Sequence, residues 1–253
     1  MPDNGSISVE ITNNIGTLTF HHPKGNSLPG RLLEDMASKI TELGENNEVR
    51  VILLKSKGEG AFCAGASFTE LTSIEDFIAG KKFFMGFAKV INAMRKAPKI
   101  VVARVQGKAV GGGVGLASAA DYTLAADGAS VKLSELALGI GPFVVGPAVK
   151  RKIGPGAFGH LAINATEWRD ASWACRHGLY ADLYDSMESL DEGVKKLTHQ
   201  LAGSSPEALE ELKKMLWQDT DDWDALLEER AEISGRLVLS DYTREAIAAF
   251  KKK

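Results

Sequence analysis

Two loops of small residues and one glutamate carry the chemistry that this sequence offers. The loops are Phe62-Cys63-Ala64-Gly65-Ala66 and Gly111-Gly112-Gly113-Val114-Gly115, each after an apolar, strand-like run, and Glu135 follows a little further on. Loops without bulky side chains let a ligand approach the main chain, so that backbone N–H groups become available as hydrogen-bond donors. If both loops meet at one carbonyl oxygen, they form an oxyanion hole, which predicts an enzyme acting on carbonyl compounds.

The glycine run lies where a helix is expected to begin. It follows the apolar run that ends at Val105 and precedes a small-residue helix candidate over residues 114–120. A helix start has unpaired N–H groups and a partial positive charge, which suit a developing oxyanion. A phosphate-binding loop is disfavoured because no Gly-Lys-Ser/Thr follows, and the glycine spacing of a dinucleotide-binding loop is also absent. Taken alone, such a run is structural about as often as functional.

Glu135 stands among apolar neighbours, between Leu133-Ser134 and the segment 136–140. Burial there desolvates the carboxyl group, raises its pKa and suits it to proton transfer near neutral pH. The alternative is an exposed glutamate in the first helical turn after a Ser134 N-cap. Capping statistics alone favour this alternative by about five to one.

The other reactive residue types predict structural roles. Cys63 has no histidine close in sequence, so we expect a small buried residue rather than a nucleophile. The five histidines lack metal-ligand spacing, and we expect no metal site. Asp121 stands at a strand start, where capping of the backbone is favoured over catalysis.

Strand-like and helix-like runs alternate up to about residue 149 and predict an α/β fold. The expected elements are a hairpin of residues 7–11 and 17–20 turning at Asn13-Asn14, helices over 29–44 and 83–94, and strands over 49–54, 100–105 and 122–126. Strands that alternate with helices imply parallel crossovers. Nearly continuous apolar runs fit strands that are covered on both faces.

Beyond Gly154 the strand signal nearly ends. Amphipathic helices are expected over residues 188–201, 206–217, 223–239 and 242–250. Their apolar faces must pack on the core, on a neighbouring subunit, or on both.

The composition fits a globular protein. The chain has 253 residues, 44% of them apolar and 25% charged, a formal charge of -3 and two cysteines. These values give no reason to expect nucleic acid or a membrane surface as partner, and they argue against a disulfide framework. No basic start precedes an apolar stretch, and no run reaches the roughly 20 apolar residues of a membrane span, so we expect a cytoplasmic protein.

Four segments resemble the signature segments of the enoyl-CoA hydratase/isomerase (crotonase) superfamily. Phe62 to Ser67 and Val105 to Gly113 resemble its two oxyanion-hole segments, the second of the form Asn-Gly-x-x-x-Gly-Gly-Gly. His22 to Leu28 is similar to Arg-Pro-x-x-x-Asn-Ala-Leu, and Ser134 to Gly139 to Pro-Glu-x-x-x-Gly. Order and spacing agree from about residue 7 to the last helix, so the resemblance covers nearly the whole chain.

The resemblance implies an α/β fold with a ββα spiral core and a helical C-terminal trimerisation region. The core, with the acyl-CoA site, corresponds to residues 1–190, and the helical region, packing on core and neighbouring subunits, to residues 191–253. The implied assembly is a homotrimer or a hexamer. The implied ligand is an acyl-CoA thioester of fatty acid metabolism, and no cofactor is needed because coenzyme A is part of the substrate.

The resemblance also implies roles for individual residues. The N–H groups of Ala66 and Gly112 would hold the thioester oxygen, and Glu135 would transfer protons. Substrate-binding residues by the same match are Lys24, Asn26, Ala64, Gly65, Gly113, Phe143, Phe250 and Lys251. Of these, Phe250 and Lys251 would reach towards the nucleotide of coenzyme A.

Two departures from the family pattern decide between reactions. Hydratases of the family carry a second glutamate at the position of Gly115, whereas isomerases that shift a double bond keep only the one at Glu135. Gly141-Pro142-Phe143-Val144 replaces a glycine-rich turn that in hydratases helps to hold the reacting water, and Phe143 would fill some of that space. We therefore expect an isomerase with Glu135 as acid and base.

Three alternatives stay open: hydration of a 2-enoyl-CoA, thioester hydrolysis, and binding of acyl-CoA without catalysis. A second acid could come from Glu70, Glu75 or Asp76, although a solvated helix face is the expected place for them.

Overall fold

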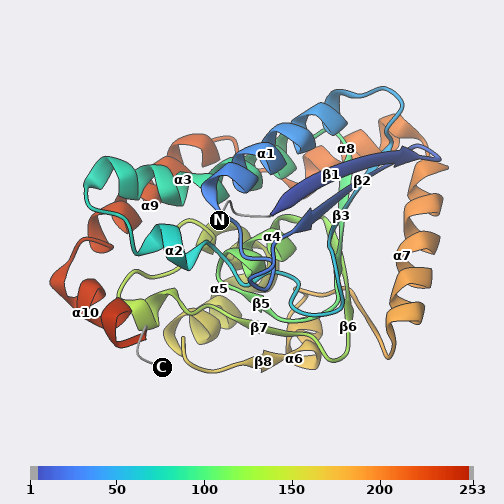
Figure 1. Ribbon diagram of the computed structural model, residues 1–253. Coiled ribbons are helices and arrows are strands. Elements are labelled where there is room, and N and C mark those ends of the chain that lie inside the picture. Colours follow the sequence, from blue (N-terminus) through green and yellow to red (C-terminus); the bar gives the residue numbers. More distant parts are fainter. Residues whose placement is uncertain (1–4, 251–253) are drawn as a thin grey trace.

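A six-stranded sheet organises the protein, which the computed structural model describes over residues 5–250, with the backbone alone at Phe250 (Figure 1). Its strands in spatial order are β1 (Ser6–Thr12), β2 (Ile15–His21), β3 (Val51–Ser56), β4 (Ile100–Val105), β6 (Tyr122–Ala126) and β9 (Asp182–Tyr184). A second, three-stranded sheet has the order β5 (Ala109–Val110), β7 (Ser130–Lys132) and β8 (Arg169–Asp170). The fold is therefore α/β, as predicted.

The chain enters the large sheet through the predicted hairpin. β1 and β2 pair antiparallel, whereas β2, β3, β4, β6 and β9 pair parallel along the sheet. The turn residues Asn13 and Asn14 have φ values of 53° and 62°. Asparagine tolerates this left-handed region better than most residues do, which explains the tight two-residue turn.

Helices cover both faces of the large sheet. They are α1 (Gly30–Glu45), α2 (Phe68–Leu71), α3 (Phe77–Lys96), α4 (Gly112–Ala119), the 3-10 helix η1 (Glu135–Leu138), α5 (Gly146–Ile163), α6 (Ala171–Arg176), α7 (Met187–Ala202), α8 (Pro206–Leu216), α9 (Trp223–Leu237) and α10 (Asp241–Phe250). On β3, Val51 and Leu53 share a core cluster with Leu190 and Val194 of α7. The alternate residues of β3 belong to the cluster on the other face, with α1 and α3. This double burial explains the continuous apolar runs.

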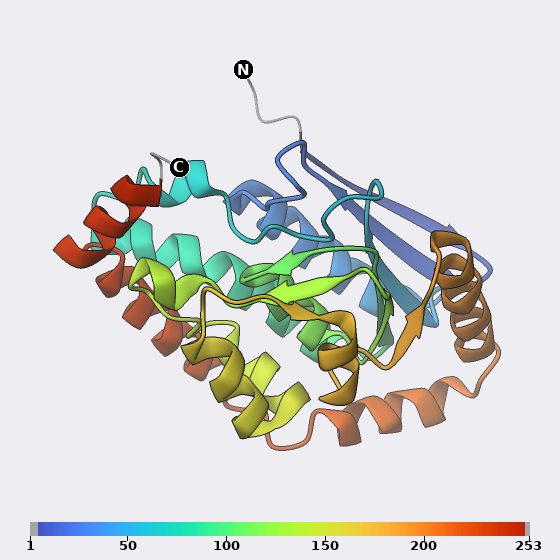
Figure 2. The ribbon, with the colours of Figure 1, turned by 90° about the horizontal axis from the view of Figure 1, so that it is seen from below.

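The C-terminal helices pack on the core of their own chain (Figure 2). α9 crosses α3 so closely that a methyl group at Gly80 would lie 2.8 Å from the carbonyl oxygen of Gly235. α10 rests on η1, where a methyl group at Gly139 would lie 2.6 Å from the Tyr242 ring. The boundary near residue 190 and the contacts with neighbouring subunits stay predictions.

Four short strands and one bend go beyond the sequence expectation. β5 and β8 have two residues each, and β7 and β9 have three each, which is too short for an alternating pattern to be recognised. α5 bends at Gly154, whose φ of 76° and following proline interrupt the helix. Within residues 5–250, no helix is both long and apolar enough to cross a membrane.

Candidate active site

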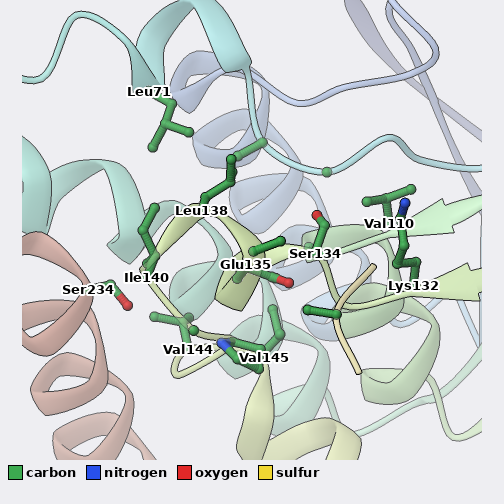
Figure 3. A pocket seen from close by; sticks show the side chains of 18 of the residues that line it. Leu71, Val110, Lys132, Ser134, Glu135, Leu138, Ile140, Val144, Val145 and Ser234 are labelled. Carbon is green, nitrogen blue, oxygen red and sulfur yellow. The ribbon is translucent and has the colours of Figure 1, made fainter. Parts of the chain in front are cut away.

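The two small-residue loops and Glu135 meet at one cavity of about 790 Å³. Ala66, Gly112 and Glu135 all contribute to its wall. Figure 3 shows Glu135 in the middle of the view, with Lys132 on one side and Ile140 and Ser234 on the other. The predicted convergence of loops and glutamate is thus present.

The two loops are joined by main-chain hydrogen bonds. The Cys63 N–H donates to the Lys108 carbonyl at 3.2 Å, and the Val110 N–H donates to the Cys63 carbonyl at 2.9 Å. This parallel bridge places the residues that follow side by side. A Cβ at Gly65 would lie 3.6 Å from the Gly112 nitrogen.

Both donor N–H groups are unused by the fold. The bridge to Leu28 uses the residues on either side of Ala66. The Leu28 N–H donates to the Gly65 carbonyl at 2.8 Å, and the Leu28 carbonyl accepts from the Ser67 N–H at 3.2 Å, so the Ala66 N–H takes no part in it. Gly112 is the first residue of α4, where helical N–H groups have no acceptor within the helix. Across the described range 5–250, neither N–H donates to a protein acceptor.

The backbone of the second loop requires glycine. Gly111 has a φ of 52°, and a Cβ there would lie 2.9 Å from Glu135 Oε1. A Cβ at Gly112 would overlap the ring of Phe87. The carboxyl group and the aromatic ring therefore rest directly on the main chain that carries the donor.

Glu135 is half-buried, and one oxygen of its carboxyl group is buried without a hydrogen-bond partner. It is the first residue of η1, and the Ser134 side chain that precedes it caps no helical N–H. Its Oε2 atom is buried and accepts no hydrogen bond from any described residue. Burial raises the pKa of Glu135 from its ordinary value of 4.5 to about 7. The alternative of an exposed glutamate behind a Ser134 cap is therefore wrong.

No second acid reaches the cavity from the expected positions. Among the described wall residues, Glu135 is the sole carboxylate. Glu70 Oε2 instead accepts from the Gly30 N–H at 2.8 Å, and Asp76 caps the start of α3. Glu75 is exposed and is not part of the wall.

Apolar side chains occupy the place where a glutamate at position 115 would point. Gly115 is buried in α4, and a Cβ there would lie 2.5 Å from Val145 Cγ1. Val145 lines the cavity together with Phe143 and Val144. A longer side chain at Gly115 would have to displace Val145.

The wall of the cavity is apolar in one part and polar in another. The apolar part is formed mainly by Leu71, Phe83, Phe84, Leu138, Ile140, Ala246 and Ala249. Ala64, Thr166 and Trp168 are exposed wall residues, and the part of the wall formed by Trp168 and the adjacent Lys132 is called the mouth. The aliphatic part of a ligand is best accommodated along the apolar part.

Several predicted substrate-binding residues lie outside the wall. Asn26 is buried in a turn with φ of 56°, and its side-chain amide donates to the carbonyls of Lys57 and Ala61. A Cβ at Gly113 would overlap the Cys63 carbonyl, so this glycine permits close packing of the loops. Lys24 donates to the Thr69 hydroxyl at 3.2 Å.

Binding by these three residues stays a prediction, as does binding by Phe250 and Lys251. Lys251 and the side chain of Phe250 lie outside the described residues. Ala64, Gly65 and Phe143 do line the cavity.

Two structural predictions are confirmed. Burial raises the pKa of Cys63 to about 12, so its thiol does not supply a thiolate near neutral pH. Asp121 accepts from the Val101 N–H at 2.7 Å. It also binds Lys213 Nζ at 2.6 Å and Trp217 Nε1 at 2.7 Å, which anchors α8 to the core.

The sequence reasoning missed Lys132, Val145 and Trp168 as wall residues. One signal was available for Lys132: it lies only three residues before Glu135 in the sequence, so the chain keeps it near the carboxyl group. Val145 and Trp168 reach the cavity through tertiary packing alone. Two unused N–H donors beside an unpaired acid can stabilise a negative oxygen and transfer a proton.

Comparison with known proteins identifies relatives along nearly the whole chain. The enoyl-CoA hydratase/isomerase family profile matches residues 10–253. A carnitinyl-CoA dehydratase of Escherichia coli is 31% identical over 214 residues, which is 83% of this chain and 80% of the relative. A short-chain-enoyl-CoA hydratase of Clostridium acetobutylicum is 28% identical over 251 residues, which is 98% of this chain and 95% of the relative.

Solved structures show the same fold. An enoyl-CoA hydratase from Bacillus halodurans aligns with a TM-score of 0.89 at 22% identity, over 96% of this chain and 99% of that one. An enoyl-CoA hydratase/isomerase from Xanthobacter autotrophicus Py2 aligns with a TM-score of 0.86 at 20% identity, over 98% of this chain and 93% of that one. The fold prediction is confirmed.

Proposed function

This chain belongs to the enoyl-CoA hydratase/isomerase family, and from that premise we propose that it shifts the double bond of a 3-enoyl-CoA to the 2-position. One observation carries the proposal: among the described wall residues, Glu135 is the sole carboxylate. Syn hydration calls for one group that activates water and another that protonates the α-carbon. A double-bond shift needs only one group, which removes a proton and returns it elsewhere.

The reaction begins with removal of a proton. The ionised Glu135 takes a proton from the α-carbon, and the C–H electron pair moves into the thioester to give a dienolate. The negative charge collects on the thioester oxygen, where the N–H groups of Ala66 and Gly112 donate to it. Each such donor contributes about 10²- to 10³-fold to the rate.

The reaction ends with return of the proton. Glu135, now protonated, delivers its proton to the γ-carbon, and the electrons of the dienolate form the 2,3-double bond. No water enters the product. A pKa of about 7 suits both steps, because the group is then neither too weak a base nor too weak an acid at neutral pH.

The apolar surroundings support this assignment. Val145 fills the space beside Gly115, and Phe143 and Val144 line the wall on the same segment. Apolar side chains offer no hydrogen bonds to a reacting water. A dienolate needs only the carboxyl group and the two N–H donors.

Hydration is the second candidate, and the names of the relatives favour it. The Clostridium acetobutylicum relative is named as a short-chain-enoyl-CoA hydratase. In this case Glu135 would have to serve both the water and the α-carbon, which one carboxylate does poorly. Removing one positioned acid or base costs about 10²- to 10⁴-fold in rate.

A two-substrate assay separates the candidates. The protein is mixed with a 3-enoyl-CoA or with a 2-enoyl-CoA, and the absorbance of the conjugated thioester is followed. The proposal predicts a rise with the 3-enoyl substrate and no fall with the 2-enoyl one. A fall with the 2-enoyl substrate alone would support hydration, and saturable binding without change would indicate a binding protein.

A further inference from the structure

The mouth of the cavity carries positive charge that the double-bond shift does not use. Lys132, the last residue of β7, lines the cavity, and its Nζ lies 4.7 Å from the centre of the Trp168 ring. The Nζ of Lys108 lies 5.1 Å from the centre of the same ring. Trp168 is 38% exposed, so a ligand entering from solvent can reach this cluster.

Neither Lys132 nor Lys108 forms an ion pair with any residue of the described part of the chain. Like charges that share one ring repel each other, and a ring face offsets this only in part. An anion bound at the mouth would relieve the repulsion and would be attracted by both ammonium groups.

Hydroxyl groups also line the cavity. Ser134 and Thr166 both belong to the wall, and the Ser134 side chain caps no helical N–H. Figure 3 shows Ser134 between Glu135 and Lys132, on the side of the carboxyl group that lies opposite Ile140. Ammonium and hydroxyl donors together match the oxygens of a carboxylate or a phosphate.

We propose that Lys132 and Lys108, held against Trp168, form an anion-binding subsite that recognises a negatively charged oxygen group of the thioester substrate. Ser134 and Thr166 contribute hydrogen bonds to the same group. The inference rests on the proposed function, because it takes an acyl-CoA as the ligand. Two parts of such a ligand carry this chemistry: a carboxylate on the acyl group, and the phosphates of coenzyme A.

Calorimetric titration with four unreactive thioesters distinguishes these sources. The probes are butyryl-CoA, glutaryl-CoA, butyryl-pantetheine and glutaryl-pantetheine, of which only butyryl-pantetheine carries no anion. The wild-type protein is compared with Lys132→Met and with Lys108→Met. Lys196→Met, an exposed lysine on the outer helix α7, is the matched control.

Loss of a charge-assisted contact should weaken binding of an anionic probe about tenfold or more. If the acyl carboxylate is recognised, Lys132→Met weakens both glutaryl probes and spares both butyryl probes. If the phosphates are recognised, it weakens both coenzyme A probes and spares both pantetheine probes. Lys108→Met should follow the same pattern to a smaller extent, and Lys196→Met should change nothing.

Two results would overturn the subsite. One is unchanged binding of all four probes by Lys132→Met. The other is an equal loss for all four, including butyryl-pantetheine, which would indicate a merely structural lysine. If the wild-type protein bound none of the thioesters, the proposed function itself would be wrong. Failure of the subsite and failure of the proposed function therefore give different results.

Discussion

Two buried carboxyl groups of this protein have opposite surroundings. Asp121, whose side chain is 2% exposed, receives hydrogen bonds from Val101, Lys213 and Trp217. Glu135 has one buried oxygen that accepts none. A fully partnered carboxylate holds the structure together, whereas an unpartnered one is destabilising and free to react. Asp121 therefore anchors α8 to the core, whereas Glu135 is the carboxyl group that is available for chemistry in the cavity.

The largest effect on activity is expected at the unpartnered group. Glu135→Gln keeps the shape of the side chain but cannot accept a proton, so kcat/KM for a 3-enoyl-CoA should fall about 10²- to 10⁴-fold. Binding of a saturated acyl-CoA should stay within a few-fold of wild type. A variant that retains near-wild-type turnover would show that another group carries the proton.

The largest effect on stability is expected at the partnered group. Asp121→Ala leaves the buried Lys213 ammonium without its counter-charge and should lower the free energy of unfolding by about 3–5 kcal/mol. Turnover by the folded fraction should be unchanged. Urea unfolding measures the loss, and Glu228→Ala, which removes an exposed partner of Lys81, should cost no more than about 1 kcal/mol. Equal losses of unfolding free energy in Asp121→Ala and Glu228→Ala would show that Asp121 is no more important to stability than an exposed carboxylate.

The oxyanion donors can be tested through the main chain. Gly112→Ala forces Phe87 or the loop to move, which misplaces the N–H and should lower kcat by about 10²- to 10³-fold. Gly128→Ala is the matched control, because nothing lies within 4 Å of a Cβ at that position. If both alanine variants turned over equally well, Gly112 would not be a donor.

The pH dependence follows from the raised pKa of Glu135. Since the ionised form removes the proton, kcat/KM should rise with pH through about 7. Stability should change in the opposite direction: the folded state binds the proton more tightly than the unfolded one, so the free energy of unfolding falls as pH rises from 4.5 to about 7. The fall should be no more than about 3 kcal/mol.

Thermal or urea unfolding across this pH range measures that fall. Glu135→Gln should flatten it and should be more stable than wild type above neutral pH. A wild-type protein whose stability rises with pH over the same range would contradict the unpartnered state of Glu135.

The sequence predicts those parts of the fold that are dictated by local patterns. Alternating burial on β2 and continuous burial on β4 leave clear periodicity, and Asn13-Asn14 indicates the turn. Short strands such as β8 leave no recognisable periodicity in the sequence. The pairing of Asp121 with Lys213 joins residues that are far apart in the chain, which no local pattern records.

The candidate site was predicted in part. Gly111–Gly113 and Glu135 stand out by type and spacing, and the cavity does bring these segments together. The burial of the Glu135 carboxyl group depends on how η1 packs against the second loop. Capping statistics do not contain this packing, and they favoured an exposed glutamate. The Lys132–Trp168 contact and the filling of the space beside Gly115 by Val145 likewise arise only in the folded chain. Assembly into trimers or hexamers stays a prediction.

The most direct test of a single acid and base is deuterium incorporation during turnover of a 3-enoyl-CoA in deuterated water, followed by NMR. Because Glu135 returns the proton that it removes, solvent deuterium enters only where the protonated carboxyl group exchanges before the transfer. We expect wild-type protein to form a 2-enoyl-CoA whose γ-carbon keeps part of the substrate's own α-proton, with any deuterium confined to the α- and γ-carbons, and we expect Glu135→Gln to abolish both the transfer and the incorporation. A 3-hydroxyacyl-CoA product, or undiminished deuterium incorporation in the Glu135→Gln variant, would contradict the role of Glu135 as the single acid and base.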